Sequence, residues 1–515
     1  MTQRHTKIKK KKMYRYHSEN RYKRKKRGHY SHYKFRSKRT KRTNTRIYKS
    51  ESILGRKFES FVLQIVDAIF PIDNNQEIQK FLKNKPSEEE IRSYMQEHAQ
   101  ESVRINHAGF KKAQNLIIKG LLQIQSEIKT SKKRLKEARQ QKSDKKNLWL
   151  AQVNTLEYQE TVLKHLANTI FWHLINGELH IARRFYQYVH GDKNLEDTNY
   201  KSVLIVANKI NAKPDNFVLL TDITSYVQIG DLFGIVDGKR SLIEVKEGER
   251  NGEILKDMNA VHSANLPICK LIEKYKEHPK DIEQIKRILK QENVAIDEIN
   301  IINTDKGYDP VTDRHIKVFT PKEDTVYFHN EMHDLEKQLS AKGFWAYTVV
   351  DECLHIGLYK NIWKMLGRPT LETIAKDQNI EHKLIVDARV AMKTMDCPLL
   401  FLPFSRQLII DIIFGKVIML LMLDIDRFMK LFERYGTSCS WTSRKEATKI
   451  NEGAKHLNIY MERNRAIKMK NAHGVETIMS MGTLSKILFN HIRPTYVAYS
   501  SNYITMQEID NEKNL

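Results

Sequence analysis

Cysteine is scarce in this chain of 515 residues, and the few that occur follow no spacing pattern. The four cysteines lie far apart and include no C-x-x-C pair: Cys269, Cys353, Cys397 and Cys439. This spacing excludes the common zinc motifs and gives no basis for a disulfide framework. It fits a reducing compartment, so we expect a cytoplasmic protein, or a nuclear one in a eukaryote.

Apolar runs of membrane-spanning character are also missing. The N-terminus has no apolar segment of the kind found in a secretory signal. The most apolar stretch, Leu408 to Leu423, is interrupted by Asp411 and Lys416, which are costly inside a bilayer. We therefore expect no membrane partner, and we expect this stretch to form two buried strands that turn at residues 414–416.

Acidic residues are almost absent from residues 1–50, which hold 21 Lys/Arg and a single acid, Glu19. About +20 of the formal net charge of +26 therefore lies here, and the rest of the chain holds 67 basic against 61 acidic residues. The segment also lacks the apolar residues needed for a core, which predicts a disordered tail.

Tyrosines interleaved with the basic residues of the tail suit phosphate neutralisation combined with base stacking. The tail is therefore predicted to bind nucleic acid, with DNA favoured over RNA. The residues proposed for this binding are Lys23, Arg24, Lys25, Lys26, Arg27, Tyr30 and Tyr33. A ribosome-like or nuclear-import extension and attraction to an anionic membrane surface are the alternatives.

Glycine and proline are rare between residues 86 and 190. The sequence from Pro86 to Glu90 is typical of a capped helix start. Beyond it, apolar residues recur every three or four positions on both sides of the polar segment 140–147, which predicts an antiparallel helical hairpin of coiled-coil type. Residues 100–176 would act as a rigid spacer, as the contact for a second copy or a protein partner, or as an arm that grips substrate.

The candidate metal-ligating and catalytic side chains are concentrated between Asp231 and Lys246. Residues 232–236 and 242–246 are predicted strands, and the Asp-Gly pair between them is a favoured two-residue turn. Because side chains alternate along a strand, Glu244 and Lys246 share a face, and Asp231 can lie across from them. Two converging carboxylates favour Mg²⁺ or Mn²⁺, and a nearby lysine can stabilise charge on phosphorus. An ordinary surface hairpin is the alternative.

The Gly-Asp231 step followed by Leu-Ile-Glu244-Val-Lys246 resembles the PD-(D/E)xK nuclease superfamily, in particular archaeal Holliday-junction resolvases and Mrr-like restriction endonucleases. Residues 53–70 are similar to the opening helix of that group. The resemblance implies Asp231, Glu244 and Glu59 as metal ligands, with Lys246 completing the catalytic set. It covers only residues 53–70 and about 215–270.

The predicted class is α/β, with a restriction-endonuclease-like mixed sheet flanked by helices, a long helical hairpin insertion and a mixed α+β C-terminal module. The expected order is a tail (1–50), the first nuclease helix (51–72), the helical insertion (86–190), the nuclease core (200–300) and the C-terminal module (310–515). Local patterns predict strands at 202–207, 216–220, 343–350 and 399–423, and helices at 253–291, 371–378 and 443–465.

A second acidic pair, Asp424-Ile-Asp426, follows an apolar run and is similar to the first metal-binding segment of diguanylate-cyclase-type palm domains. Those domains need a later Gly-Gly-Asp/Glu-Glu-Phe hairpin, and none occurs downstream. Acids at this place are also typical of a helix start, which is the interpretation favoured here.

The sequence therefore predicts a Mg²⁺-dependent nuclease that hydrolyses phosphodiester bonds in DNA. The resemblance implies a role in prokaryotic anti-phage defence or in DNA repair. The alternative is a non-catalytic nucleic-acid-binding or scaffold protein that retains a nuclease-like fold.

Overall fold

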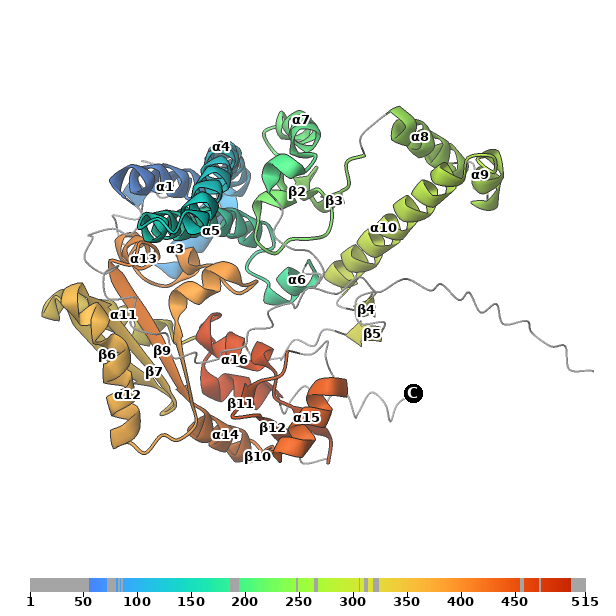
Figure 1. Ribbon diagram of the computed structural model, residues 1–515. Helices are drawn as coiled ribbons and strands as arrows, with labels where there is room; N and C mark the ends of the chain where they lie inside the picture. Colours follow the sequence, from blue (N-terminus) through green and yellow to red (C-terminus); the bar gives the residue numbers. More distant parts are fainter. Residues whose placement is uncertain are drawn as a thin grey trace, which may run out of the picture. The chain divides into compact units, whose positions relative to one another are not determined.

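The computed structural model describes twelve stretches of the chain (Figure 1): residues 55–71, 80–81, 84, 87–185, 194–246, 249–263, 267–304, 306–309, 314–317, 324–453, 458–471 and 474–501. The basic tail, including the predicted nucleic-acid-binding residues Lys23 to Tyr33, lies outside these residues. The predicted α/β class and the long helical hairpin are confirmed. The predicted mixed sheet is wrong for the described residues, because every pair of described strands is antiparallel.

The helical layer is built from α1 (Arg56–Ile69), α3 (Glu88–Glu97), α4 (Ala99–Gln140) and α5 (Lys146–Leu174). Ser87 begins α3 with the expected capping box, in which its side chain and that of Glu90 each accept from the other's backbone N–H. The α4–α5 hairpin turns at the predicted polar break. Gly120 permits close packing, since a Cβ there would lie 2.7 Å from the Leu163 side chain and 2.8 Å from Phe61 of α1.

A three-stranded antiparallel sheet in the order β1-β2-β3 follows α6 (Leu179–Arg184) and α7 (Tyr200–Asn211). Its strands are β1 (Phe217–Leu220), β2 (Leu232–Val236) and β3 (Lys239–Ile243). Asp237 and Gly238 form the predicted turn, both with positive φ (48° and 77°), as a tight two-residue hairpin requires. The sheet thus holds the Asp231-to-Lys246 segment, although β3 ends three residues earlier than predicted.

The predicted strand at 202–207 is wrong, because these residues belong to α7. The Val-Leu-Ile-Val run suggests a strand by composition, but α7 buries Val203, Ala207 and Asn211, which lie four residues apart on one helical face. The Asn211 side chain also bonds to the backbone N–H of Val218 at 2.8 Å, which ties the helix to β1.

Three helices follow the sheet where one long helical stretch was predicted. They are α8 (Glu249–Ser263), α9 (Cys269–Lys274) and α10 (Pro279–Thr304). They share a small apolar cluster formed by Ile254, Met258, Leu271, Tyr275, Ile285 and Ile288. The short strands β4 (Lys306–Asp309) and β5 (Arg314–Lys317) pair with each other after α10.

The C-terminal region contains a sheet in the order β6-β7-β9-β8. Its strands are β6 (Trp345–Val350), β7 (Leu354–Lys360), β8 (Lys383–Asp387) and β9 (Val417–Asp424), and its neighbouring helices are α11 (His329–Lys342), α12 (Gly367–Asp377), α13 (Arg406–Ile413) and α14 (Ile425–Arg434). β6 and α12 match the predictions. β9 is buried along its whole length, which explains its unbroken apolar sequence.

The predicted pair of strands within 408–423 is half wrong, and residues 399–413 form no strand. Residues 399–401 are a short 3₁₀ turn, and Ser405 caps α13 by accepting from the backbone N–H of Leu408. A fully apolar run cannot distinguish a buried strand from a buried helix by periodicity, so the cap at Ser405 decides the outcome.

A second small sheet follows, with β12 (Arg465–Lys470) paired to β10 (Ser438–Trp441), β11 (Met461–Glu462) and β13 (Glu476–Ile478). The predicted helix at 443–465 ends early: α15 covers Arg444–Gly453, and β11 begins at Met461. The last described helix is α16 (Met481–Leu488).

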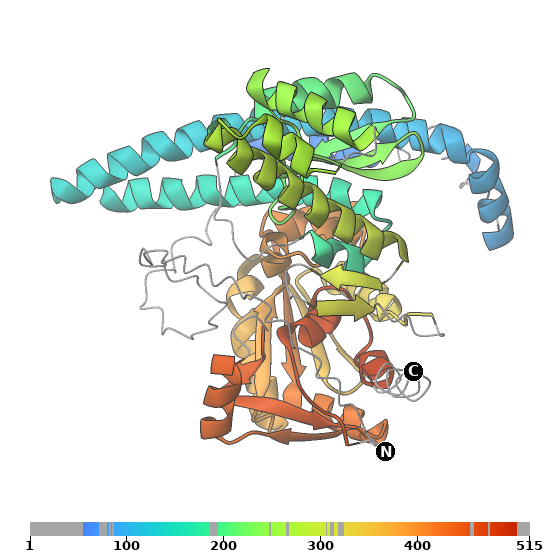
Figure 2. The same ribbon diagram turned by 90° about the vertical axis from the view of Figure 1, so that its right-hand side faces the viewer.

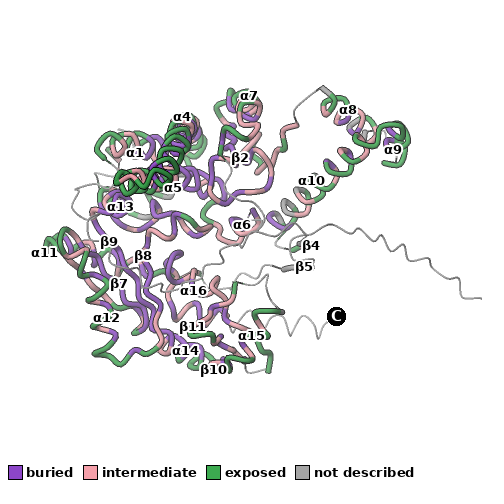
Figure 3. The backbone as a smooth tube through the Cα atoms, viewed as in Figure 1, coloured by how far each residue is buried: buried purple, intermediate pink, exposed green. Residues whose placement is uncertain are grey.

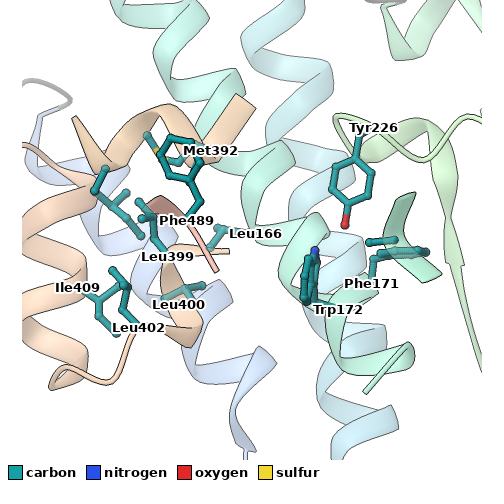
Figure 4. Close-up of a cluster of buried hydrophobic side chains, with 14 of the residues drawn as sticks. Leu166, Phe171, Trp172, Tyr226, Met392, Leu399, Leu400, Leu402, Ile409 and Phe489 are labelled. Atoms are coloured by element: carbon teal, nitrogen blue, oxygen red, sulfur yellow. The ribbon is translucent and has the colours of Figure 1, made fainter. Parts of the chain in front are cut away.

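One cluster of buried apolar side chains extends from α1, α4 and α5 through β1 and β2 to β7, β9 and α16. The buried residues of the chain are purple in Figure 3. Figure 4 shows part of it, with Leu166 of α5 near Leu399, Met392 and Phe489. Within this cluster the His165 ring accepts from the Leu399 backbone N–H at 3.0 Å, and burial lowers the pKa of His165 to about 3. No helix among the described residues is long and apolar enough to cross a membrane.

Candidate functional site

Asp231 and Glu244 are brought together at the end of the β2–β3 hairpin that lies away from its turn. The Asp231 backbone N–H donates to the Ile243 carbonyl at 2.9 Å. One Asp231 carboxylate oxygen, Oδ2, accepts from the backbone N–H of Val245 at 2.7 Å. The Asp231 side chain therefore fixes the chain just beyond β3, where Glu244 and Lys246 follow.

Lys246, Glu244 and Gln291 form a closed group of hydrogen bonds. Lys246 Nζ donates to Glu244 Oε1 at 2.8 Å and to Gln291 Oε1 at 2.6 Å, and Gln291 Nε2 donates to Glu244 Oε1 at 3.0 Å. The Lys246 side chain is only 9% exposed and the Glu244 side chain 33%. A lysine so enclosed is held in one orientation, and the helix α10, which carries Gln291, supplies part of the enclosure.

The surroundings of Asp231 disfavour the charged form of its carboxyl group. Burial raises its pKa to about 6, and the neighbouring charges of Glu244 and Asp222 act in the same direction. The Val245 N–H and the Lys246 ammonium favour the charged form but do not overcome these effects. A cation beside Asp231 would stabilise its charged form, and a carboxyl group perturbed by burial and a neighbouring charge is characteristic of functional sites.

Two members of this site were missed by the sequence analysis. Asp222 lies in a short 3₁₀ turn, Thr221–Ile223, directly after β1. An acid following a buried strand was the available signal. Gln291 lies 45 positions from Lys246, inside a helix rich in polar residues, and nothing in its local sequence distinguishes it.

The prediction that Glu59 joins this site is not supported by its placement. Glu59, on α1, forms an ion pair with Lys416, which also lies 3.7 Å from Asp411. Among the described residues no group of three His, Cys, Asp or Glu is arranged to hold a metal ion. The structure therefore brings together Asp231, Glu244 and Lys246, but not Glu59.

The remaining donor atoms fit a divalent cation held by two carboxylates. Within the described part of the chain, Asp231 Oδ2 accepts from Val245 and Glu244 Oε1 accepts from Lys246 and Gln291, so an ion would use Asp231 Oδ1 and Glu244 Oε2. Mg²⁺ is typically bound by one or two carboxylates, with waters and substrate phosphate oxygens completing its shell. Asp231 and Glu244 would hold it.

Comparisons with protein-family models, curated proteins and solved structures give no match.

The second acidic pair, Asp424 and Asp426, forms hydrogen bonds that stabilise the fold. Asp424 caps α14 by accepting from the Arg427 backbone N–H at 3.0 Å, as the helix-start interpretation predicted. Asp426 accepts from the His382 ring at 2.9 Å and from the Trp441 indole at 3.4 Å. Both carboxylates thus accept hydrogen bonds from groups of the protein, and the resemblance to palm domains receives no support.

Proposed function

We propose that this protein is a metal-dependent nuclease that hydrolyses phosphodiester bonds in DNA at the site formed by Asp231, Glu244 and Lys246. The observation that carries the proposal is the pairing of Asp231 with Glu244, in which the burial of Asp231 and the neighbouring charge of Glu244 raise the pKa of Asp231 to about 6. Beside them lies an enclosed lysine, and this combination suits a reaction that builds negative charge on phosphorus.

Each residue has a distinct role in this proposal. Asp231 and Glu244 hold the divalent ion, which when bound supplies polarisation of a phosphoryl oxygen and lowers the pKa of a water molecule. Lys246 neutralises charge at the phosphorus centre, and Gln291 orients the Lys246 ammonium through its 2.6 Å hydrogen bond. Asp222 adds negative potential that favours a cation near Asp231.

The test is a cleavage panel of linear, nicked, branched and single-stranded DNA and of RNA, with Mg²⁺ or Mn²⁺ and with chelator. Asp231→Asn, Glu244→Gln and Lys246→Met should each abolish cleavage. Asp237→Asn and Lys239→Met are matched controls, because both residues lie at the opposite end of the same hairpin and are exposed. Cleavage that survives all three site variants would reject the proposal.

A second candidate function, nucleic-acid binding without cleavage, is favoured by one observation. Lys246 is engaged by both Glu244 and Gln291, so its ammonium is already neutralised by a protein carboxylate. If the same panel yields binding of nucleic acid but no metal-dependent cleavage of any substrate, the scaffold function is the correct one.

A further inference from the structure

Positive charge is concentrated at the distal end of the helical hairpin, residues 129–146, here called the hairpin tip. Nine of its 18 residues are Lys or Arg and two are acidic, an excess of seven. From residue 51 onward the whole chain holds 67 basic and 61 acidic residues, an excess of six. The tip therefore accounts for all of the net positive charge outside the N-terminal tail.

The basic side chains of the tip point away from the packed surface of the hairpin. Ser131, Leu135 and Ala138 are the buried positions of α4 in this segment, and they face α5. The Lys and Arg residues lie between them and are exposed: Lys129, Lys132, Lys133, Arg134, Lys136, Arg139, Lys142, Lys145 and Lys146. Figure 2 shows α4 and α5 running side by side to this end.

Among the residues that the structure describes, most of these charges have no counter-ion. Lys132 pairs with Glu157 at 2.8 Å, and the Arg134 guanidinium lies 4.9 Å from the centre of the Trp149 ring. Within the described residues, the other seven have no carboxylate partner. Like charges three or four residues apart on one helix destabilise it, so the tip is under repulsion that an external polyanion would relieve.

We propose that the hairpin tip binds the phosphate backbone of duplex nucleic acid. The spacing of its charges fits this partner. Lys129, Lys133 and Lys136 lie along one face of α4. The four-residue step from Lys129 to Lys133 rises ~6 Å, close to two phosphate intervals of ~3.4 Å along a DNA strand, and the three-residue step to Lys136 rises ~4.5 Å. Contacts of this kind are independent of base sequence, so the tip supplies affinity and orientation but no specificity.

This inference deepens the proposed nuclease function by assigning a surface that holds its substrate, and it rests on that function only for the identity of the substrate. Binding at the tip requires neither Asp231 nor a metal ion. The two proposals can therefore fail separately, and binding measured in chelator tests the tip alone.

The experiment measures binding of the full chain to a labelled DNA duplex in EDTA over a series of KCl concentrations. The variant K129Q/K133Q/K136Q/K146Q removes four tip charges and keeps good helix formers. The matched control, K376Q/K430Q/K445Q/K449Q, removes four exposed lysines elsewhere in the described chain. Both variants keep the basic tail, so any difference between them reports the tip.

We expect the tip variant to bind at least ~10-fold more weakly and its plot of log K against log [salt] to flatten by about 2–4, since each lost phosphate contact removes ~0.9 from the slope. The control should retain the native slope. Equal slopes and affinities for the tip variant and the native chain would overturn the proposal. A second result would also overturn it: a tip variant that binds the duplex normally but no longer self-associates in sedimentation. The tip would then be a contact between copies of the chain.

Discussion

Glu59 and Lys416 form an ion pair between residues 357 positions apart in the sequence. The pair joins α1 to the turn that precedes β9, and both side chains are largely shielded, at 17% and 29% exposure. Removing one partner leaves the other charge poorly solvated, which costs more than an exposed pair would. Glu59 is thus assigned to the stability of the fold and not to the proposed site of Asp231 and Glu244.

Glu59→Gln should lower the free energy of unfolding by about 1–2 kcal/mol, because the Lys416 ammonium keeps only the more distant Asp411 as a neutralising partner. Urea denaturation measures the loss. Metal-dependent cleavage by the folded variant should stay at the native level. If the variant kept native stability but lost cleavage, the result would indicate instead that Glu59 is a ligand of the site.

The local structure that the sequence predicted correctly depends on short-range rules. The Asp237-Gly238 turn supplies two positive φ angles, and the Ser87 capping box is complete within four residues. The strand predicted at 202–207 was wrong because β-branched composition was outweighed by burial of Val203, Ala207 and Asn211 along one face of α7. The strand propensity of the residues determines the secondary structure of such a segment only where tertiary packing does not.

The site could be predicted only as far as one hairpin extends. Asp231, Glu244 and Lys246 were predicted from strand alternation, and the structure brings them together although β3 ends at Ile243, because Asp231 binds the Val245 N–H just beyond the strand. Gln291 reaches them through the placement of α10, which no local pattern encodes. Glu59 was predicted as a metal ligand because its helix resembles the opening helix of the nuclease superfamily. Its ion pair with Lys416 is a long-range contact that the sequence does not reveal.

Asp231→Asn should stabilise the protein at mildly alkaline pH while abolishing cleavage. The folded-state pKa of Asp231, about 6, lies above its ordinary value of 3.8, so the folded state binds the proton more tightly. Stability from this group is therefore greatest at low pH and falls as pH rises from about 4 to 6. Asparagine removes the charge that causes this loss and can still accept from Val245 N–H.

The expected gain is on the order of 1–2 kcal/mol above pH ~6, after discounting for solvent screening, and it should vanish near pH ~4. Thermal unfolding of the metal-free native and variant proteins across this pH range measures it. Asp237→Asn is the control, because the exposed Asp237 at the turn has its pKa lowered by Lys213. A gain that is equal at all pH values would contradict the assignment of a raised pKa to Asp231.

Gln291→Met should reduce the rate of cleavage about 10-fold, since groups that orient a metal site or its catalytic side chains typically contribute factors of this size. The substitution removes one of the two acceptors of the Lys246 ammonium and one of the two donors to Glu244 Oε1. Gln291→Glu keeps an acceptor for Lys246 and should recover part of the rate with a shifted pH profile.

Gln284→Met provides the matched control for Gln291. Gln284 lies on the same helix, α10, and its side chain donates to Asn251 at 2.9 Å, away from Asp231 and Glu244. Its loss should affect stability slightly and leave the pH dependence of cleavage unchanged. Equal effects of the two variants on rate and pH profile would mean that Gln291 acts only through the packing of α10.

Gly234 and Gly252 give a matched test of the sheet that holds the site. A Cβ at Gly234 in β2 would lie 2.0 Å from the Phe217 carbonyl oxygen and 2.7 Å from the Val218 Cα, both backbone atoms of the paired strand β1. Backbone atoms in a paired strand cannot move aside as a side-chain end can. Gly234→Ala should therefore cost about 3 kcal/mol of unfolding free energy, as overpacking does in a close-packed interior.

At Gly252, on the exposed surface of α8, an added Cβ meets no atom within 4 Å. Gly252→Ala should stabilise the protein by about 0.5–1 kcal/mol, because alanine loses less conformational entropy in a helix. Urea denaturation of both variants checks the pair. Since β1 precedes Asp222 and β2 follows Asp231, the Gly234 variant should also lose cleavage under conditions where the Gly252 variant retains it. A Gly234→Ala protein with native stability would show that β1 and β2 do not pair as closely as this sheet requires.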